Sequence, residues 1–313
     1  MDPVIAPTLV ERAAEHLRKN VRRTTLGFAN GGSPQQSVVS PARVHGSPFS
    51  PPTPKAMPGG MAPQRPTSRS IVLDYSRLQA AHVNDWSGPR TQVSEELRVI
   101  KRQLLRQAFP LPGAIRGDDA NLIMTTSARP GEGKTFAALN LAFGIATEPN
   151  RHVLLVDADT SRQGVGDVIG LRDQCGLLDV LSGKEPDLSR VILRTDIPNF
   201  ALLPAGMARD DAAELLASPR MTALLREMSL RYSDRIVLID APPCLVSSDP
   251  MALAGSVGQV VFIVEAARTQ RDEIEFALEM VKDCPNISLI LNKVQVTDNA
   301  SLGAYGPYYG FLP

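Results

Sequence analysis

The chain has 313 residues, of which 43% are apolar and 21% charged, so it can bury a core and is long enough for about two domains. Its 33 basic and 33 acidic side chains cancel, which argues against nucleic acid as a partner. The three cysteines form no C-x-x-C pair, which excludes a disulfide scaffold and a zinc motif and fits a reducing cytosol. No apolar run reaches the roughly eighteen residues of a membrane span, and no signal-peptide pattern opens the sequence, so we expect a soluble, cytoplasmic protein.

The first 91 residues divide into a basic helix and a linker. Residues 1–26 place apolar side chains at helical spacing beside several basic ones, which predicts a short amphipathic helix whose basic face meets either solvent or anionic lipid. Residues 27–91 form the linker. Nine prolines, five glycines and seven serines lie between residues 31 and 70, a composition typical of disorder. Near residues 70–78 we expect order to resume.

Residues 92–298 are expected to form the folded domain. A helix over 94–105, with Ser94 as its cap, is expected at the start of this domain, because apolar residues recur there at steps of three and four. Beyond residue 120, short apolar runs alternate with helical patterns. The expected strands cover 121–128, 152–158, 199–206, 234–242, 259–266 and 287–294, and the expected crossover helices cover 133–147 and 269–283. This alternation predicts an α/β domain with a doubly wound, mostly parallel sheet, followed by a flexible tail over 299–313.

The sequence ARPGEGKT at residues 128–135 lies between an expected strand and an expected helix, as a phosphate-binding loop does. Glycines let backbone N–H groups turn toward phosphate oxygens, Lys134 would reach the β- and γ-phosphates, and the Thr135 hydroxyl would ligate Mg²⁺. The first position is Ala128 instead of the usual glycine, and the alternative of a plain Gly-Pro turn would not need Lys134 or Thr135. We therefore predict a P-loop NTPase domain. The residues expected to line the nucleotide are Pro130, Gly131, Glu132, Gly133, Lys134, Thr135 and Phe136.

Two more apolar strands end in carboxylates. The segment 153–159 ends in Asp157 and Asp159, and the segment 236–243 carries Asp240 after four apolar residues. In open α/β sheets, ligands bind at the carboxyl ends of the strands. Two neighbouring carboxylates there would be matched by Mg²⁺ or by a hydroxyl to be deprotonated, and solvated helix caps are the alternative. Asp240 can hold Mg²⁺ through water, as in nucleotide hydrolases and phosphotransferases.

Together, the loop and the two carboxylate motifs resemble the deviant P-loop ATPases, which include the septum-positioning and plasmid-partition ATPases. The loop lacks the signature lysine of the partition ATPases. With the SEELRVIKRQLL segment and three C-terminal tyrosines, the chain is most similar to the bacterial tyrosine kinases of capsule and exopolysaccharide synthesis. The segments TLVERAAEHL and IVLDYSRLQAA are similar to those of the exosortase-associated tyrosine autokinases.

The resemblance implies an ATP- and Mg²⁺-dependent kinase that phosphorylates its tail in trans and regulates exopolysaccharide polymerisation or export. Lys134 would stabilise the transferring phosphate, and either Asp157 or Asp159 would orient or deprotonate the tyrosine hydroxyl. The implied Mg²⁺ ligands are Thr135, Asp157 and Asp240. The implied phosphoacceptors are Tyr305, Tyr308 and Tyr309, for which sticky aromatic residues of a disordered end are the alternative. Asn292 matches the family asparagine near the adenine, or is simply a polar residue at a strand end.

The resemblance also implies a homo-oligomer, of ring type, assembled through an E-x-x-R-x-x-R helix. Glu95 and Arg98 match this motif, whereas Lys101 replaces its last arginine. A membrane polysaccharide chain-length determinant protein would activate the kinase and recruit it from the cytoplasm to the inner face of the membrane.

Four residues depart from the family pattern, namely Ala128, Phe136, Gln163 and Lys101. Two other functions therefore stay open. A scaffold pseudokinase would bind nucleotide without forming phosphotyrosine. A non-kinase ATPase switch would dimerise with ATP to position cargo or recruit a partner, and its loop would be expected to carry a signature lysine that this chain lacks.

Overall fold

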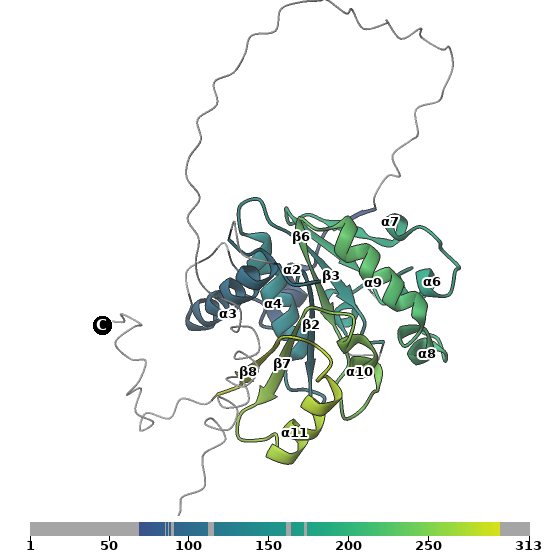
Figure 1. Ribbon diagram of the computed structural model, residues 1–313. Helices are drawn as coiled ribbons and strands as arrows, with labels where there is room; N and C mark the ends of the chain where they lie inside the picture. Colours follow the sequence, from purple (N-terminus) through teal and green to yellow (C-terminus); the bar gives the residue numbers. More distant parts are fainter. Residues whose placement is uncertain are drawn as a thin grey trace, which may run out of the picture. The chain divides into compact units, whose positions relative to one another are not determined.

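The computed structural model describes residues 69–84, 86, 88, 91–111, 116–160, 164–171 and 174–294 (Figure 1). The helix expected over 1–26, most of the expected linker and the expected tail over 299–313 lie outside the described residues. Within the described part of the chain, no helix is both long and apolar enough to cross a membrane.

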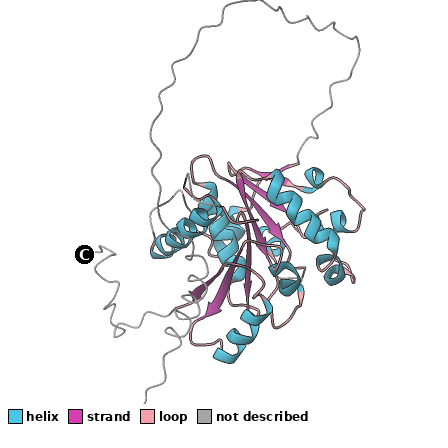
Figure 2. Cartoon of the chain, viewed as in Figure 1, coloured by secondary structure: helices cyan, strands magenta, loops and turns pink. Residues whose placement is uncertain are grey.

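The domain is built around one sheet (Figure 2), which has eight strands. Its strands are β1 (Ser70–Ile71), β2 (Leu122–Ser127), β3 (His152–Asp157), β4 (Leu193–Thr195), β5 (Phe200–Leu203), β6 (Arg235–Asp240), β7 (Gln259–Glu265) and β8 (Ile287–Asn292). Their order across the sheet is β1-β4-β5-β3-β6-β2-β7-β8, and every neighbouring pair is parallel except β4 and β5. The predicted doubly wound, mostly parallel sheet is therefore confirmed.

Helices cover both faces of the sheet (Figure 1). The helices are α2 (Tyr75–Ala80), α3 (Gln92–Ala108), α4 (Lys134–Ala146), α5 (Val165–Ile169), α6 (Leu177–Leu181), α7 (Leu188–Val191), α8 (Ala212–Leu216), α9 (Pro219–Arg231), α10 (Asp249–Ala254) and α11 (Arg271–Met280). Helices α2 to α5 pack with one face of the sheet into one hydrophobic core, and α6 to α11 pack with the other face into a second. Because both faces are covered, the central strands are buried at nearly every position.

The sheet edges depart from the expected pattern. Strand β8 pairs only with β7, and its Leu289 and Leu291 are 52% and 60% exposed, so it is not buried on both faces as predicted. At the other edge, β1 and α2 lie inside the range 27–91 assigned to the linker. Leu73 and Leu78 of this segment are buried in the core, which explains why order resumes near residues 70–78 and shortens the linker.

Helix α3 begins earlier than predicted. Its cap is Thr91 and not Ser94, because the Thr91 hydroxyl accepts a hydrogen bond from the Ser94 backbone while the Ser94 hydroxyl accepts one from Thr91 N. This reciprocal pair satisfies two backbone donors that the first turn of a helix leaves free.

Candidate functional site

The loop at residues 128–133 connects β2 to α4, and α4 begins at Lys134. Gly133 has a φ of +100°, a left-handed conformation that residues with a side chain rarely adopt. A Cβ at this position would also clash with the amide nitrogen of Asn292. Both constraints require glycine, and they place the start of α4 where its free backbone N–H groups can meet an anion.

Lys134 lies inside the site and is only 7% exposed. Its ammonium forms an ion pair of 2.5 Å with Oδ2 of Asp159, which is 2% exposed. The carboxylate compensates the buried positive charge in the chain without nucleotide. A phosphate that binds Lys134 would therefore replace Asp159 as its counterion.

Asp240 is fully buried at the end of β6. The Thr135 hydroxyl donates to its Oδ2 over 2.7 Å, and the Thr125 hydroxyl lies 3.2 Å from its Oδ1. Burial raises the pKa of Asp240 to about 6, although the Lys134 charge and the two threonine hydroxyls oppose this shift. The predicted pair of Thr135 and Asp240 is thus in direct contact.

Asp157 is the register partner of Asp240 across β3 and β6. Its Oδ2 accepts a hydrogen bond of 2.8 Å from Gly166 N, while its Oδ1 is buried without a hydrogen-bond partner. Burial, and then the nearby charge of Asp240, raise the pKa of Asp157 to about 8. Asp157 therefore keeps its proton to higher pH than an exposed aspartate does.

These oxygens fit a magnesium ion. Thr135, Asp157 and Asp240 offer a hydroxyl and carboxylates, and the partnerless Oδ1 of Asp157 has an unused coordination site. No group of three or more His, Cys, Asp or Glu side chains among the described residues is placed to hold a metal by itself. This suits Mg²⁺, which takes one or two carboxylates and fills its other positions with water and substrate phosphates.

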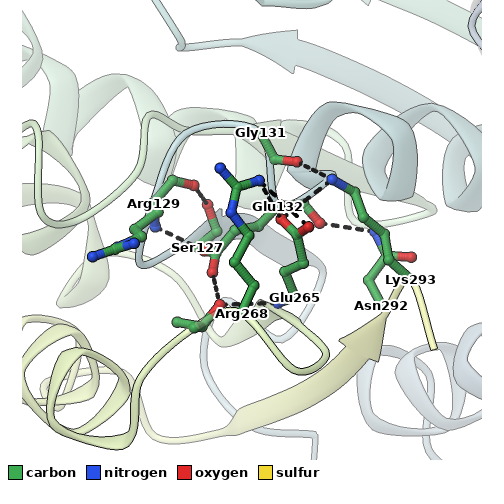
Figure 3. Close-up of polar contacts among 9 residues, drawn as sticks. Ser127, Arg129, Gly131, Glu132, Glu265, Arg268, Asn292 and Lys293 are labelled. Carbon is green, nitrogen blue, oxygen red and sulfur yellow. Dashed lines mark hydrogen bonds and ion pairs between the residues drawn. The ribbon is translucent and has the colours of Figure 1, made fainter. Parts of the chain in front are cut away.

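A second set of contacts, which the sequence analysis missed, ties the loop to the segment between β7 and α11 (Figure 3). Glu132 is 1% exposed; its Oε2 accepts a hydrogen bond of 2.7 Å from Arg129 N, and its Oε1 accepts one from the Thr269 hydroxyl. Arg129 also forms an ion pair with Glu273 of α11. Thr269 follows the carboxyl end of β7, which is the signal in the sequence that could have drawn attention to it.

The end of β8 supports the other side of the loop (Figure 3). Asn292 Nδ2 donates to the Glu132 carbonyl over 2.8 Å, and Lys293 Nζ donates to the Gly131 carbonyl over 2.7 Å. Lys293 Nζ also lies 3.2 Å from Oε2 of Glu265. Asn292, predicted to lie near the adenine, therefore contacts the backbone of the phosphate-binding loop in the ligand-free chain.

Phe136 and Pro130 are two further residues that are predicted to line the nucleotide. Phe136 lies in the first turn of α4 and lines a small apolar groove with residues of α3 and β8, among them Leu97 and Ile290. Pro130 lies in the loop itself, two residues after the buried Ala128. The methyl group of Ala128 is accommodated in the core, so glycine is not needed at this first position.

Lys101, the third position of the predicted oligomerisation motif, is an internal anchor in this structure. Its side chain is 4% exposed, and its Nζ donates to the Gly144 carbonyl over 2.9 Å and pairs with Glu148 over 2.5 Å. The carbonyl end of α4 attracts this cation. The ammonium also lies 5.4 Å from the centre of the Trp86 ring, which packs against Gly144.

Glu95 and Arg98 remain on the outer part of α3. They pair with each other over 3.4 Å, with side chains 33% and 28% exposed, so the structure leaves them partly accessible. The other predicted site residues, Tyr305, Tyr308 and Tyr309, and the departure at Gln163 lie outside the described residues.

Known proteins share this fold and these motifs. The tyrosine-protein kinase YwqD of Bacillus subtilis is 29% identical over 76% of this chain and 96% of its own length. The tyrosine-protein kinase wzc of Salmonella typhimurium is 33% identical over 50% of this chain. Among solved structures, the kinase domain of the Escherichia coli tyrosine kinase ETK superposes with a TM-score of 0.61 and 25% identity, covering 76% of this chain and 86% of that domain.

These matches confirm the resemblance to bacterial tyrosine kinases. The chain spans 31% or less of the length of several relatives, including 21% of wzc, so it corresponds to one part of those proteins. Residues 120–287 match the AAA domain family, and this segment contains the loop, Asp157, Asp159 and Asp240. Because the match covers more than half of the 313 residues, the chain belongs to the AAA domain family.

Proposed function

We propose that this chain is an ATP- and Mg²⁺-dependent protein-tyrosine kinase that phosphorylates tail tyrosines of a neighbouring copy. The observation that carries the proposal is the meeting of Lys134, Thr135 and three buried carboxylates at the carboxyl ends of adjacent strands. The names of YwqD, wzc and ETK favour a tyrosine as the acceptor. The Mg²⁺ would neutralise charge on the β- and γ-phosphates when bound.

Each residue has a separate role in this proposal. Lys134 would leave Asp159 and bind the transferring phosphate, while Thr135 and Asp240, with Asp157, would hold Mg²⁺. The tyrosine oxygen attacks the γ-phosphorus, the bond to the ADP oxygen breaks, and a carboxylate accepts the hydroxyl proton. Asp159 suits the last role, because its carboxylate contacts Lys134 directly and so lies next to the position that the transferring phosphate would take.

A non-kinase ATPase switch is the second candidate. Its partition-type members carry a signature lysine in the loop, and residues 128–133 contain no lysine. The missing lysine favours the kinase over the switch.

The acceptors proposed are Tyr305, Tyr308 and Tyr309, and the proposed cellular role is control of exopolysaccharide polymerisation or export. A membrane chain-length determinant would activate the chain at the inner face of the membrane. Glu95 and Arg98 would contribute to a homo-oligomeric ring. Each tail phosphate would add about −1.5 to −2 charges and favour ring disassembly, so an unchanged oligomer size in light scattering after full phosphorylation would contradict this regulation.

The test is phosphotyrosine mass spectrometry of the purified chain incubated with Mg²⁺ and ATP, with and without the membrane activator. Lys134→Met and a triple tyrosine-to-phenylalanine variant of the tail are the controls. We expect tail phosphotyrosine in the wild type and none in Lys134→Met. Hydrolysis of ATP without phosphotyrosine, even with activator, would leave the switch, and nucleotide binding without turnover would leave the scaffold.

A further inference from the structure

Residues 69–80 enter the domain along one edge of the sheet. Strand β1 contributes two residue pairs to β4, Ser70 with Arg194 and Ile71 with Thr195. Leu73 and Leu78 then anchor the segment in the core. With only two strand residues paired to β4, the segment is held at this edge mainly by the contacts of its side chains.

Asp196, directly after β4, fastens this segment with both of its oxygens. Oδ1 accepts a hydrogen bond of 3.1 Å from Leu73 N, and Oδ2 accepts one of 2.8 Å from the Tyr75 hydroxyl. The same contact raises the pKa of Tyr75, because the hydroxyl donates to a carboxylate. Attachment of the segment thus depends on the Tyr75 hydroxyl remaining a donor.

Tyr75 is also the more accessible of the two tyrosines that the described residues contain. It is 56% exposed. Tyr232 is half-buried, and the centre of its ring lies 5.8 Å from the central guanidinium carbon of Arg231 and 4.6 Å from that of Arg235. An attacking active site can therefore reach the Tyr75 hydroxyl more readily than that of Tyr232.

We propose that Tyr75 is a further phosphoacceptor and that its phosphorylation releases residues 69–80 from the sheet edge. This inference rests on the proposed kinase function. The Tyr75 oxygen forms a bond to the γ-phosphorus of ATP, the bond to the ADP oxygen breaks, and a carboxylate of the attacking site takes the hydroxyl proton. The donor that binds Asp196 is thereby lost.

Charge drives the release. The phosphate adds about −1.5 to −2 charges beside Asp196 and one residue after Asp74. Both carboxylates repel it, and Asp74 is engaged as the cap of α2. Arg77, the nearest basic side chain of α2, already pairs with Asp74 over 3.4 Å. The net change therefore disfavours the attached segment.

Two measurements on the full chain test the inference. Mass spectrometry after incubation with Mg²⁺ and ATP should find phosphate on Tyr75 as well as on the tail, and on neither in Lys134→Met. Hydrogen exchange of peptides covering residues 69–80 should then be at least about tenfold faster in the phosphorylated wild type, which corresponds to 1.4 kcal/mol of lost protection. In Tyr75→Phe, ATP should leave the exchange rate unchanged.

The outcomes separate the two proposals. Tail phosphotyrosine without phosphate on Tyr75 overturns this inference and leaves the kinase function intact. No phosphotyrosine anywhere, even with activator, overturns both. Phosphate on Tyr75 with unchanged exchange over 69–80 overturns the release. Asp196→Asn removes one repelling charge, so its phosphorylated form should show a smaller acceleration than the phosphorylated wild type.

Discussion

Asp157→Asn should remove much of the pH dependence of stability in the ligand-free chain. An aspartate titrates near 3.8 in the reference state, and burial beside Asp240 raises the pKa of Asp157 to about 8 when folded. Between these values the folded chain holds one proton more than the unfolded chain, so the free energy of unfolding falls as pH rises. The stabilising contribution is fully present below the unfolded pKa and is lost as pH passes through about 8.

The size of the effect follows from 1.36 kcal/mol per pKa unit. From pH 5.5 to pH 8 the wild type should lose about 3 kcal/mol through Asp157, and Asp157→Asn should not. Asp240, whose pKa is raised to about 6, also lowers the free energy of unfolding as the pH rises, at the lower end of this pH range. The difference between the two proteins therefore reports the titration of Asp157 together with its coupling to Asp240.

Urea unfolding with EDTA and without nucleotide, followed by circular dichroism from pH 5.5 to 8.5, measures this difference. Asp157→Asn keeps an oxygen for the Gly166 N–H group, so its fold should persist. Asp234→Asn is the matched control, because that side chain is 59% exposed. Equal slopes for wild type and Asp157→Asn, or a wild type that grows more stable toward pH 8, would refute the reasoning.

Three other substitutions probe the remaining contacts. Lys101→Met should lower the free energy of unfolding by about 1–3 kcal/mol in urea titrations because its buried charged contacts are lost, whereas Arg102→Met on the exposed face of α3 should be nearly neutral. Gly133→Ala should weaken nucleotide binding about tenfold or more in calorimetry, and adding Asn292→Ala should relieve the clash but not the strain of the positive φ. Thr269→Ala should raise the KM for ATP about three- to tenfold, and Thr269→Ser should restore it.

For these three variants the contradicting results are equally specific. Equal stability of Lys101→Met and the wild type would mean that the anchor contributes nothing. Full recovery of nucleotide binding by the double variant at 133 and 292 would mean that the backbone conformation is unimportant. An unchanged KM for ATP in Thr269→Ala would mean that the hydrogen bond between Thr269 and Glu132 does not support the loop.

The central strands and the meeting of the carboxylates could be predicted from the sequence. Strands β3 and β6 are buried along most of their length and contain the apolar runs VLLV and IVLI, whereas in β2 the apolar LIM is followed by the buried residues Thr125, Thr126 and Ser127. Parallel strands bring their carboxyl ends to one sheet edge, so the two motifs alone predict that Asp157 and Asp240 lie at the same edge, and the register pairs them there.

The short edge strands and the long-range polar contacts could not be predicted. Strand β1 has two residues and β4 has three, too few to form a pattern. Glu132 and Thr269 are 137 positions apart, and no local spacing links them. Lys101 fits the spacing of an interface motif, but its burial depends on the carbonyl end of α4, which only the packing of α3 on α4 brings near.

The most direct test of phosphate transfer between copies mixes two variants of the chain, one without catalytic activity and one without the tail tyrosines. A Lys134→Met chain with an intact tail is incubated with Mg²⁺, ATP and a catalytically intact chain that carries phenylalanine at Tyr305, Tyr308 and Tyr309. We expect mass spectrometry to find phosphotyrosine on the tail of the Lys134→Met chain. ATP consumption by the mixture with no phosphate on that tail, also in the presence of the membrane activator, would contradict transfer to a neighbouring copy.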